Sequence, residues 1–186
     1  MEIIKTDING LVLLKPRIFK DERGEFHEFY RKTLDESIGV PAGFVQENLS
    51  VSQKGVLRGL HFQVNTPQGK LVSCLKGAIF DVAVDLRPNS DTFGHHYTVE
   101  LNSMTRQQLY VPEGFAHGFY TLSDDAIVHY KCTSYYDPSD ESGIRWDDSE
   151  LNISWPDGDK KLSPKDDILK SFGIEKEHLI EKWQNL

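Results

Sequence analysis

Cysteine is scarce in this sequence, which has only two such residues, Cys74 and Cys132, among 186. Two distant cysteines cannot form the dense disulfide framework of a small secreted protein, and no signal-peptide pattern opens the chain. We therefore expect free thiols and a cytoplasmic location. No apolar run approaches the roughly 20 residues that a membrane-spanning helix needs, so we expect no membrane partner.

Basic residues are also in short supply, with 21 Lys and Arg against 29 Asp and Glu and a net charge of -8. Proteins that bind the nucleic-acid backbone present a basic face, so we expect no nucleic-acid partner. A small anionic ligand, held by a few placed Arg and Lys side chains, remains compatible with this charge. The length predicts one domain over residues 1–186, large enough to bury a core without disulfides or metal.

Short strand-like runs separated by turn signals fill the first two thirds of the chain. In the clearest run, Ile79–Leu86, the apolar residues at positions 80, 82, 84 and 86 alternate with Asp81, Ala83 and Asp85. We expect further strands over 11–14, 26–30, 44–49, 56–62, 70–75, 97–101, 107–111, 115–122 and 127–133. About ten strands at this spacing predict a mainly β fold, an antiparallel barrel or sandwich.

Helix signals are few. A capping-box pattern at Thr33–Glu36 predicts a short helix, and Ser163-Pro164 predicts a second helix start. Residues Glu175–Trp183 are expected to form a last helix. The acidic stretch Asp137–Glu150 is expected to be a loop that packs on the barrel through its apolar residues.

The segment Gly55–Gln63 carries unusual residues for a core strand. Strict alternation places Arg58 and His61 on opposite faces of this strand. Burying an unpaired Arg is costly, so we expect an ionic partner or an anionic ligand. An edge strand with a surface Arg and a hydrogen-bonded His is an equally good interpretation at this point.

Other candidate residues have simpler explanations when each is considered alone. His117 lies among apolar residues, where a histidine is more often hydrogen-bonded in the core than a ligand. Tyr130 lies in a predicted strand, where tyrosine usually serves packing. The cluster Ser163–Asp167 is typical of a helix start, where Asp complements the helix dipole.

The seven histidines raise the question of a metal site. Metal-binding cupin barrels typically show Gly, five residues, His-x-His and then Glu, followed later by Pro-x-Gly-x-x-His. Here Gly55 is followed, after five residues, by His61-Phe62-Gln63, and the Glu position falls near Gln68. The later half is intact and ends at His117. Two ligands of four remain, so we expect no metal.

Several motifs, taken together and in order, resemble the dTDP-4-dehydrorhamnose 3,5-epimerase family, which adopts a metal-free, cupin-like jelly-roll barrel with a few short helices. They are Asp21-x-Arg23-Gly24-x-Phe26-x-Glu28, Phe44-Val45-Gln46-x-Asn48, Lys54–Gln63, Pro67–Val72, Phe80–Arg87, Pro112–Phe119, Tyr130–Thr133, Gly143–Asp148 and Leu162-Ser163-x-Lys165-Asp166. The resemblance runs from Pro16 to about Asp167, and residues 168–186 are assigned no chemistry.

The resemblance implies epimerisation at C3 and C5 of dTDP-4-dehydro-6-deoxy-D-glucose, giving dTDP-4-dehydro-L-rhamnose. Both carbons adjoin the C4 ketone, so a base can remove their protons, and reprotonation from the opposite face inverts each centre without a cofactor. One alternative is a single-centre epimerase or a ketoisomerase acting on a related nucleotide-linked 4-ketosugar. Another is a nucleotide-sugar-binding module without catalysis.

By the same resemblance, His61 matches the family's base, Asp166 its carboxylate partner, Tyr130 the acid and Lys70 the cation near the C4 oxygen. The positions that match nucleotide-sugar contacts are Arg23, Arg58 and Lys165 for the pyrophosphate, Glu28, Gln46 and Asn48 for thymine and deoxyribose, Phe19, Phe26 and Tyr136 for base stacking, and His117 and Glu141 elsewhere in the pocket. Family members are homodimers in which the N-terminal region completes the neighbour's nucleotide site, so we expect a homodimer.

Overall fold

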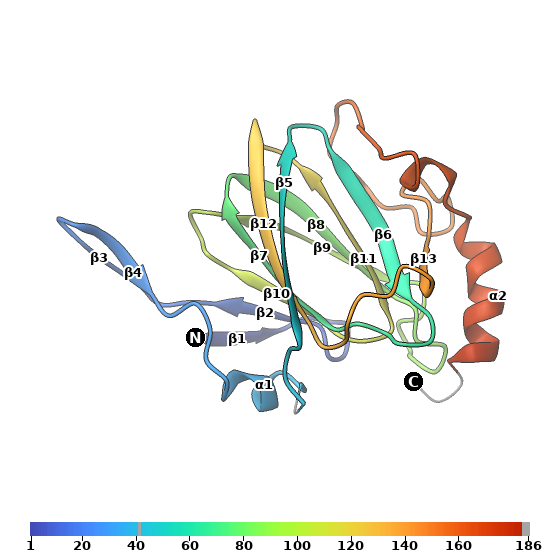
Figure 1. Ribbon diagram of the computed structural model, residues 1–186, viewed down its shortest axis with the longest axis horizontal. Coiled ribbons are helices and arrows are strands. Elements are labelled where there is room, and N and C mark those ends of the chain that lie inside the picture. The colour runs from blue at the N-terminus through green and yellow to red at the C-terminus, as the bar shows by residue number, and fades with distance from the viewer. Residues whose placement is uncertain (41, 184–186) are drawn as a thin grey trace.

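The computed structural model describes residues 1–40 and 42–183, and two antiparallel sheets dominate it (Figure 1). The six-stranded sheet has the order β1 (Glu2–Lys5), β2 (Val12–Lys15), β10 (Gln108–Val111), β7 (Lys70–Lys76), β12 (Asp125–Cys132) and β5 (Gln46–Gln53). The five-stranded sheet has the order β13 (Glu141–Gly143), β6 (Leu57–Gln63), β11 (Phe115–Thr121), β8 (Ala78–Asp85) and β9 (His96–Asn102). The mainly β fold expected from the sequence is confirmed.

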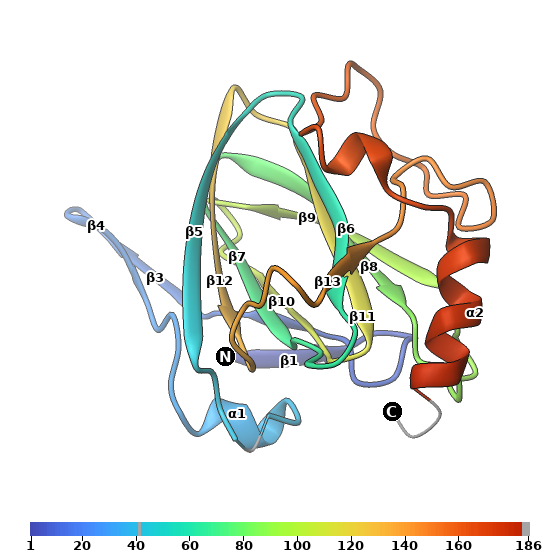
Figure 2. The ribbon, with the colours of Figure 1, turned by 45° about the vertical axis from the view of Figure 1, so that its right-hand side comes forward.

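The remaining elements lie outside these sheets. Strands β3 (Ile18–Asp21) and β4 (Gly24–His27) form a hairpin that projects from the body of the molecule (Figure 2). Helix α1 spans Leu34–Ser37, a 3₁₀ helix η1 spans Asp166–Ile168, and α2 spans Phe172–Lys182. None of the helices among the described residues is long and apolar enough to cross a membrane.

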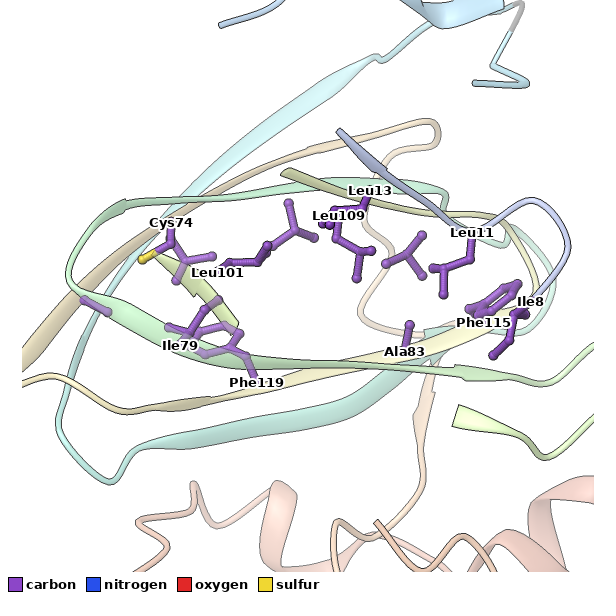
Figure 3. Close-up of a cluster of buried hydrophobic side chains, with 14 residues drawn as sticks. Ile8, Leu11, Leu13, Cys74, Ile79, Ala83, Leu101, Leu109, Phe115 and Phe119 are labelled. Atoms are coloured by element: carbon purple, nitrogen blue, oxygen red, sulfur yellow. The ribbon is translucent and has the colours of Figure 1, made fainter. Parts of the chain in front are cut away.

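The main core lies between the two sheets. Leu109 from one sheet and Ile79 from the other are fully buried there, with Phe119 beside Ile79 (Figure 3). A second apolar cluster covers the outer face of the five-stranded sheet, where Val82 and Val84 pack near Phe172 and other residues of the C-terminal segment. This sheet is therefore buried on both faces, as expected for strands that carry few exposed positions.

Burial on both faces changes the meaning of the alternation in β8. The apolar positions 80, 82, 84 and 86 belong to the outer cluster or pack against it, whereas Ile79 and Ala83 belong to the core between the sheets. Asp81 and Asp85 lie on this inner side of the strand and are also fully buried. Because a buried carboxylate needs partners, this face is the place to look for a polar site.

The observed strands overlap all ten predicted ones, although 26–30 is a strand only as far as His27. The sequence analysis missed β1, β3 and β13, which are three or four residues long. The expectation that 137–150 is entirely loop is corrected by β13. Helix α1 is present without a side-chain cap from Thr33, and α2 begins at Phe172 rather than Glu175.

The antiparallel pairing of β6 with β11 contains a register shift. His117 of β11 lies opposite His61, whereas Phe119 lies opposite Arg58, so two steps along β11 match three along β6. This irregularity lets Arg58 and His61 line the same cavity. The prediction from strict alternation, that they lie on opposite faces, is therefore wrong, because alternation fails at a bulge.

Gly59 is required at this shift. Its φ is +114°, and a Cβ built there would lie 2.6 Å from the Cα of Gly118. The two strands approach too closely at this point for any side chain.

We expect Gly59→Ala to lower the free energy of unfolding by about 1–3 kcal/mol through backbone strain and by about 1–3 kcal/mol more through overpacking. Gly24→Ala is the matched control, because Gly24 has a φ of +128° but a Cβ added there would meet nothing within 4 Å. Urea unfolding of both variants measures the difference. Equal losses would show that the close approach of β6 and β11 contributes nothing.

Candidate active site

A cavity of about 450 Å³ lies between the two sheets and contains most of the predicted site residues. The six-stranded sheet and its neighbouring loop contribute Gln46, Asn48, Ser50, Gln68, Lys70 and Tyr130; the other sheet contributes Arg58, His61, Phe62, Gln63, His117, Gly118, Phe119 and Glu141; Tyr136, Ser163, Lys165 and Asp166 complete the lining. The sequence analysis did not assign site roles to Ser50, Phe62, Gln63, Gln68, Gly118, Phe119 or Ser163. Except for Ser50, these residues lie within or beside the motifs of the family resemblance, and that position was the signal by which the sequence could have indicated them.

His61 and Asp166 form a close pair in this cavity. The Nε2 of His61 donates to Oδ1 of Asp166 at 2.5 Å, which leaves Nδ1 as the free ring nitrogen. Ser163 holds the carboxylate, since its Oγ donates to Oδ2 at 2.8 Å and accepts from the Asp166 amide at 3.1 Å. Burial would raise the pKa of Asp166, but the hydrogen bonds from His61 and Ser163 outweigh it and lower that pKa.

Tyr130 lies on β12, in the sheet opposite His61. Burial raises the pKa of its phenol, the nearby Cys132 raises it further, and Arg58 offsets part of the effect. The phenol therefore remains a proton donor at neutral pH. A ligand between the sheets would have a potential base on one side and a potential acid on the other.

Lys70, at the start of β7, also borders the cavity. Burial lowers the pKa of its ammonium, while Cys132, Glu141 and Asp81 oppose that change. Lys70 forms no ion pair within 1–40 and 42–183. Negative charge developing on a bound ligand would favour its protonated form, so its interaction with the ligand would strengthen as that charge develops.

Arg58 has a hydrogen bond but no ionic partner. Its Nε donates to Oγ of Ser52 at 3.0 Å, and the side chain is exposed at the cavity rather than buried. No ion pair of Arg58 occurs in the described part of the chain. The protein partner that one interpretation expected is thus absent there, and the guanidinium can bind an anion even though the whole chain is acidic.

Glu141 joins three side chains at one end of the cavity. Its Oε2 accepts from the Tyr136 hydroxyl at 2.5 Å and from the Lys165 ammonium, and its Oε1 lies 3.9 Å from Nδ1 of His61. Burial would raise the pKa of Glu141, but the bonds from Lys165 and Tyr136 lower it. Polar groups on this side of the cavity are therefore held in a connected network.

The remaining histidine of the cavity is paired with a residue that the sequence analysis did not assign to the site. His117 donates from Nε2 to Asp81 at 2.9 Å, and both residues are buried. The sequence pattern did not indicate Asp81, because its burial depends on the packing of both faces of β8. This pair matches both explanations of His117, because the histidine is hydrogen-bonded in the core and also lines the cavity.

The two glutamines at the cupin metal-ligand positions form hydrogen bonds to neighbouring loops. Gln63 donates to the carbonyl of Thr66 at 2.8 Å and accepts from the amide of Asp137 at 2.8 Å. Gln68 donates to the carbonyl of Ser134 at 2.8 Å. In the described residues, no group of three or more His, Cys, Asp and Glu side chains is arranged to hold a metal ion.

Four predicted contacts lie outside the cavity of their own chain. Phe19 and Phe26 are 51% and 72% exposed on the projecting hairpin (Figure 2). Arg23, at its tip, pairs with Asp21, and Glu28 pairs with Arg31. Within one chain, these four residues lie apart from the other eleven predicted site residues, which line the cavity.

Comparison with known proteins identifies the family. The family model described as dTDP-4-dehydrorhamnose 3,5-epimerase matches residues 5–173. The chain belongs to this family.

Individual epimerases of the family resemble the chain over most of its length. The dTDP-4-dehydrorhamnose 3,5-epimerase of Escherichia coli (strain K12) is 50% identical, covering 91% of this chain and 93% of that protein. Its counterpart in Methanothermobacter thermautotrophicus is 49% identical, covering 90% and 88%. The Legionella pneumophila epimerase, crystallised with dTDP-4-keto-L-rhamnose, has a TM-score of 0.92 and 48% identity, covering 96% of each chain. These findings confirm the expected family, cupin-like fold and 3,5-epimerase activity.

With His61 as the base that the resemblance implies, we expect Asp166→Asn to lower kcat by about 10²–10⁴-fold, because an amide could not stabilise the imidazolium that would form. Asp167→Asn, which changes the exposed neighbouring carboxylate, is the control and should leave kcat within about twofold. Steady-state kinetics of the two variants measures the effect. Similar kcat values would exclude a catalytic partnership between Asp166 and His61.

The same substitution has a predictable effect on stability. The lowered pKa of Asp166 means that its ionised form stabilises the fold above the ordinary pKa of 3.8, and that this contribution disappears as the pH falls through the lowered value. The difference in unfolding free energy between the parent protein and Asp166→Asn should therefore shrink below about pH 4. Urea unfolding between pH 3 and 7 measures it.

Proposed function

We propose that His61 and Tyr130 perform the two proton transfers of the 3,5-epimerisation from opposite sides of one substrate. The observation that carries this proposal is their placement on opposite sheets across a single cavity. The substrate is dTDP-4-dehydro-6-deoxy-D-glucose and the product dTDP-4-dehydro-L-rhamnose. The 4-keto sugar nucleotide bound in the Legionella relative supports this substrate class.

In the first step, Nδ1 of His61 removes the proton from a carbon next to the C4 ketone. The electron pair of the broken C–H bond moves to the C4 oxygen and gives an enolate. Asp166 stabilises the resulting imidazolium through the 2.5 Å contact with Nε2. Lys70 stabilises the enolate oxygen by hydrogen bonding and charge, as donors of an oxyanion hole do.

In the second step, Tyr130 delivers its phenolic proton to the same carbon from the other side. The enolate collapses to the ketone, and the configuration at that carbon is inverted. His61 then loses a proton to solvent and Tyr130 regains one, so no net proton is consumed. The same groups act on C3 and C5, because both carbons adjoin the ketone.

The nucleotide portion is assigned to the polar side chains around the reacting centre. Arg58 and Lys165 suit the pyrophosphate by charge, and Gln46 and Asn48 have amide groups that suit thymine and deoxyribose. Tyr136 has a half-exposed ring that can stack on the base. His117 and Glu141 supply further contacts from the five-stranded sheet and complete the set from one chain.

The active protein is proposed to be a homodimer. The exposed hairpin residues Phe19, Arg23, Phe26 and Glu28 suit a nucleotide but lie outside the cavity of their own chain, so they would contact a nucleotide in the partner subunit. On the outside of the six-stranded sheet, Leu49 and Val51 of the edge strand β5 are also exposed. Exposed apolar side chains on an edge strand are typical of a surface that pairs with another chain.

The cysteines bear on the compartment in which the enzyme works. Cys74 and Cys132 are both buried and unpaired. Free thiols of this kind are usual in reducing compartments. The proposal therefore keeps the cytoplasm as the location of the reaction.

Deuterium incorporation separates the two proton transfers. With dTDP-4-dehydro-6-deoxy-D-glucose in D₂O, the parent protein should place deuterium at C3 and C5 and invert both centres, as NMR and mass analysis would show. Tyr130→Phe should still exchange protons through His61 while inversion falls by about 10²–10⁴-fold. His61→Ala should lose exchange and inversion together. Exchange at one carbon only would indicate a single-centre epimerase, as in the Streptomyces bikiniensis 3'-monoepimerase, which is 33% identical with a TM-score of 0.88.

Mixing two defective variants tests the shared site. His61→Ala and Arg23→Ala should each be impaired alone, because one lacks the base and the other a nucleotide contact. After unfolding and refolding together, random pairing gives half mixed dimers, each with one intact site, so activity should recover to about a quarter of the parent value. Recovery no greater than the sum of the two variants would show that each chain uses its own hairpin or none.

A further inference from the structure

Cys132, the last residue of β12, lies next to residues of the candidate active site. In the six-stranded sheet, β12 lies between β5 and β7, and Cys132 pairs with Gln46 on one side and Lys70 on the other. The neighbouring row joins Asn48, Tyr130 and Val72 in the same way. Because side chains of directly paired residues share one face of a sheet, the thiol lies among four residues of the candidate site.

The contacts of Cys132 reach both the nucleotide-binding and the catalytic groups. Its sulfur accepts a hydrogen bond from Nδ2 of Asn48 at 3.7 Å, and it also interacts electrostatically with Lys70. The side chain is completely buried. It therefore contacts residues of the site but is not itself accessible to a substrate.

Asn48 is the last amide of a short hydrogen-bonded chain that begins at Tyr136. The backbone amide of Tyr136 donates to Oε1 of Gln46 at 2.9 Å, and Nε2 of Gln46 donates to Oδ1 of Asn48 at 3.0 Å. Nδ2 of Asn48 then donates to Cys132. Each link fixes which end of an amide is donor and which is acceptor, so Nδ2 of Asn48 is left to face the sulfur, and the thiol holds the end of the chain by accepting from it.

We propose that Cys132 is a positioning residue, whose thiol fixes the Asn48 amide for the nucleotide and supports Lys70 beside the C4 oxygen. This inference rests on the roles proposed above for Asn48 and Lys70. A thiol suits both contacts, since it is small enough for the close-packed sheet and its sulfur is a weak, polarisable acceptor.

The groups around Lys70 give this role a pH signature. Cys132 from β12, Glu141 from β13 and Asp81 from β8 all raise the pKa of Lys70 against the larger lowering by burial, and Tyr130, His61 and His117 share the same cavity. Cys132 also raises the pKa of Tyr130. Removing the thiol therefore lowers both pKa values, and the alkaline limb of the kcat profile moves to lower pH.

The test compares Cys132→Ala with Cys132→Ser and with Cys74→Ala in the full chain. Cys74 is the matched control, because it is a buried cysteine of the same sheet whose sulfur donates to the carbonyl of Lys76 and which does not line the cavity. The measurements are kcat, KM, their pH profiles and the dissociation constant for dTDP, determined by calorimetry. Thermal unfolding establishes that each variant is folded at the assay temperature.

Cys132→Ala should weaken dTDP binding and raise KM by about three- to tenfold, the effect of losing one hydrogen bond. Its alkaline limb should move to lower pH. Cys132→Ser retains an acceptor for Asn48 and should restore the dissociation constant to within about threefold of the parent value. Cys74→Ala should leave all of these quantities unchanged.

Two outcomes would overturn the inference. One is a Cys132→Ala protein whose KM, dTDP affinity and alkaline limb equal those of the parent protein. The other is an equal change in Cys74→Ala, which would indicate general loosening of the sheet. A Lys70→Met variant separates the role of Lys70 from the role of the thiol. Full activity in that variant would contradict the proposed role of Lys70 itself. An inactive Lys70→Met beside an unchanged Cys132→Ala would reject only the role of the thiol.

Discussion

The register shift between β6 and β11 is the constraint on which the candidate site depends. Two regular antiparallel strands would send Arg58 and His61 to opposite faces, one toward the cavity and the other toward the C-terminal segment. The shift brings both into one cavity, and the contact of Gly59 with Gly118 makes room for it. The proposed base and a proposed anion-binding residue thereby come from a single strand.

The second property of the site is the unequal distribution of ionic partners. Lys165 is paired with Glu141 at one end of the cavity, whereas Arg58 and Lys70 have hydrogen-bonding or electrostatic neighbours but no ion pair within the described ranges. A chain with a net charge of -8 thus presents two basic side chains without ionic partners at this cavity. Local placement of charge, rather than the total, determines which ligand such a protein accepts.

The sequence was sufficient for ten of the strands in the described residues and for eleven of the residues that line the cavity. Periodicity located β8, and the family resemblance carried by the ordered motifs led to eleven of the cavity residues. Alternation failed at Arg58 and His61, because a bulge is a property of two paired strands and no single-strand pattern records it. Strand β13 was missed because three residues are too few to show a period. The role of Asp81 depended on burial of both faces of β8, which only the packing of α2 and its neighbours reveals.

The C-terminal segment combines two tasks that many enzymes separate. Residues of α2 cover the outer face of the five-stranded sheet, and Asp166, just before them, enters the cavity to hold His61. During synthesis, the barrel strands emerge from the ribosome before this segment does. A nascent chain, or one clipped before Asp166, would thus contain His61 without the carboxylate proposed to act with it. The proposed catalytic pair would therefore be complete only after the chain has been made through Asp166 and its C-terminal segment has packed on the sheet.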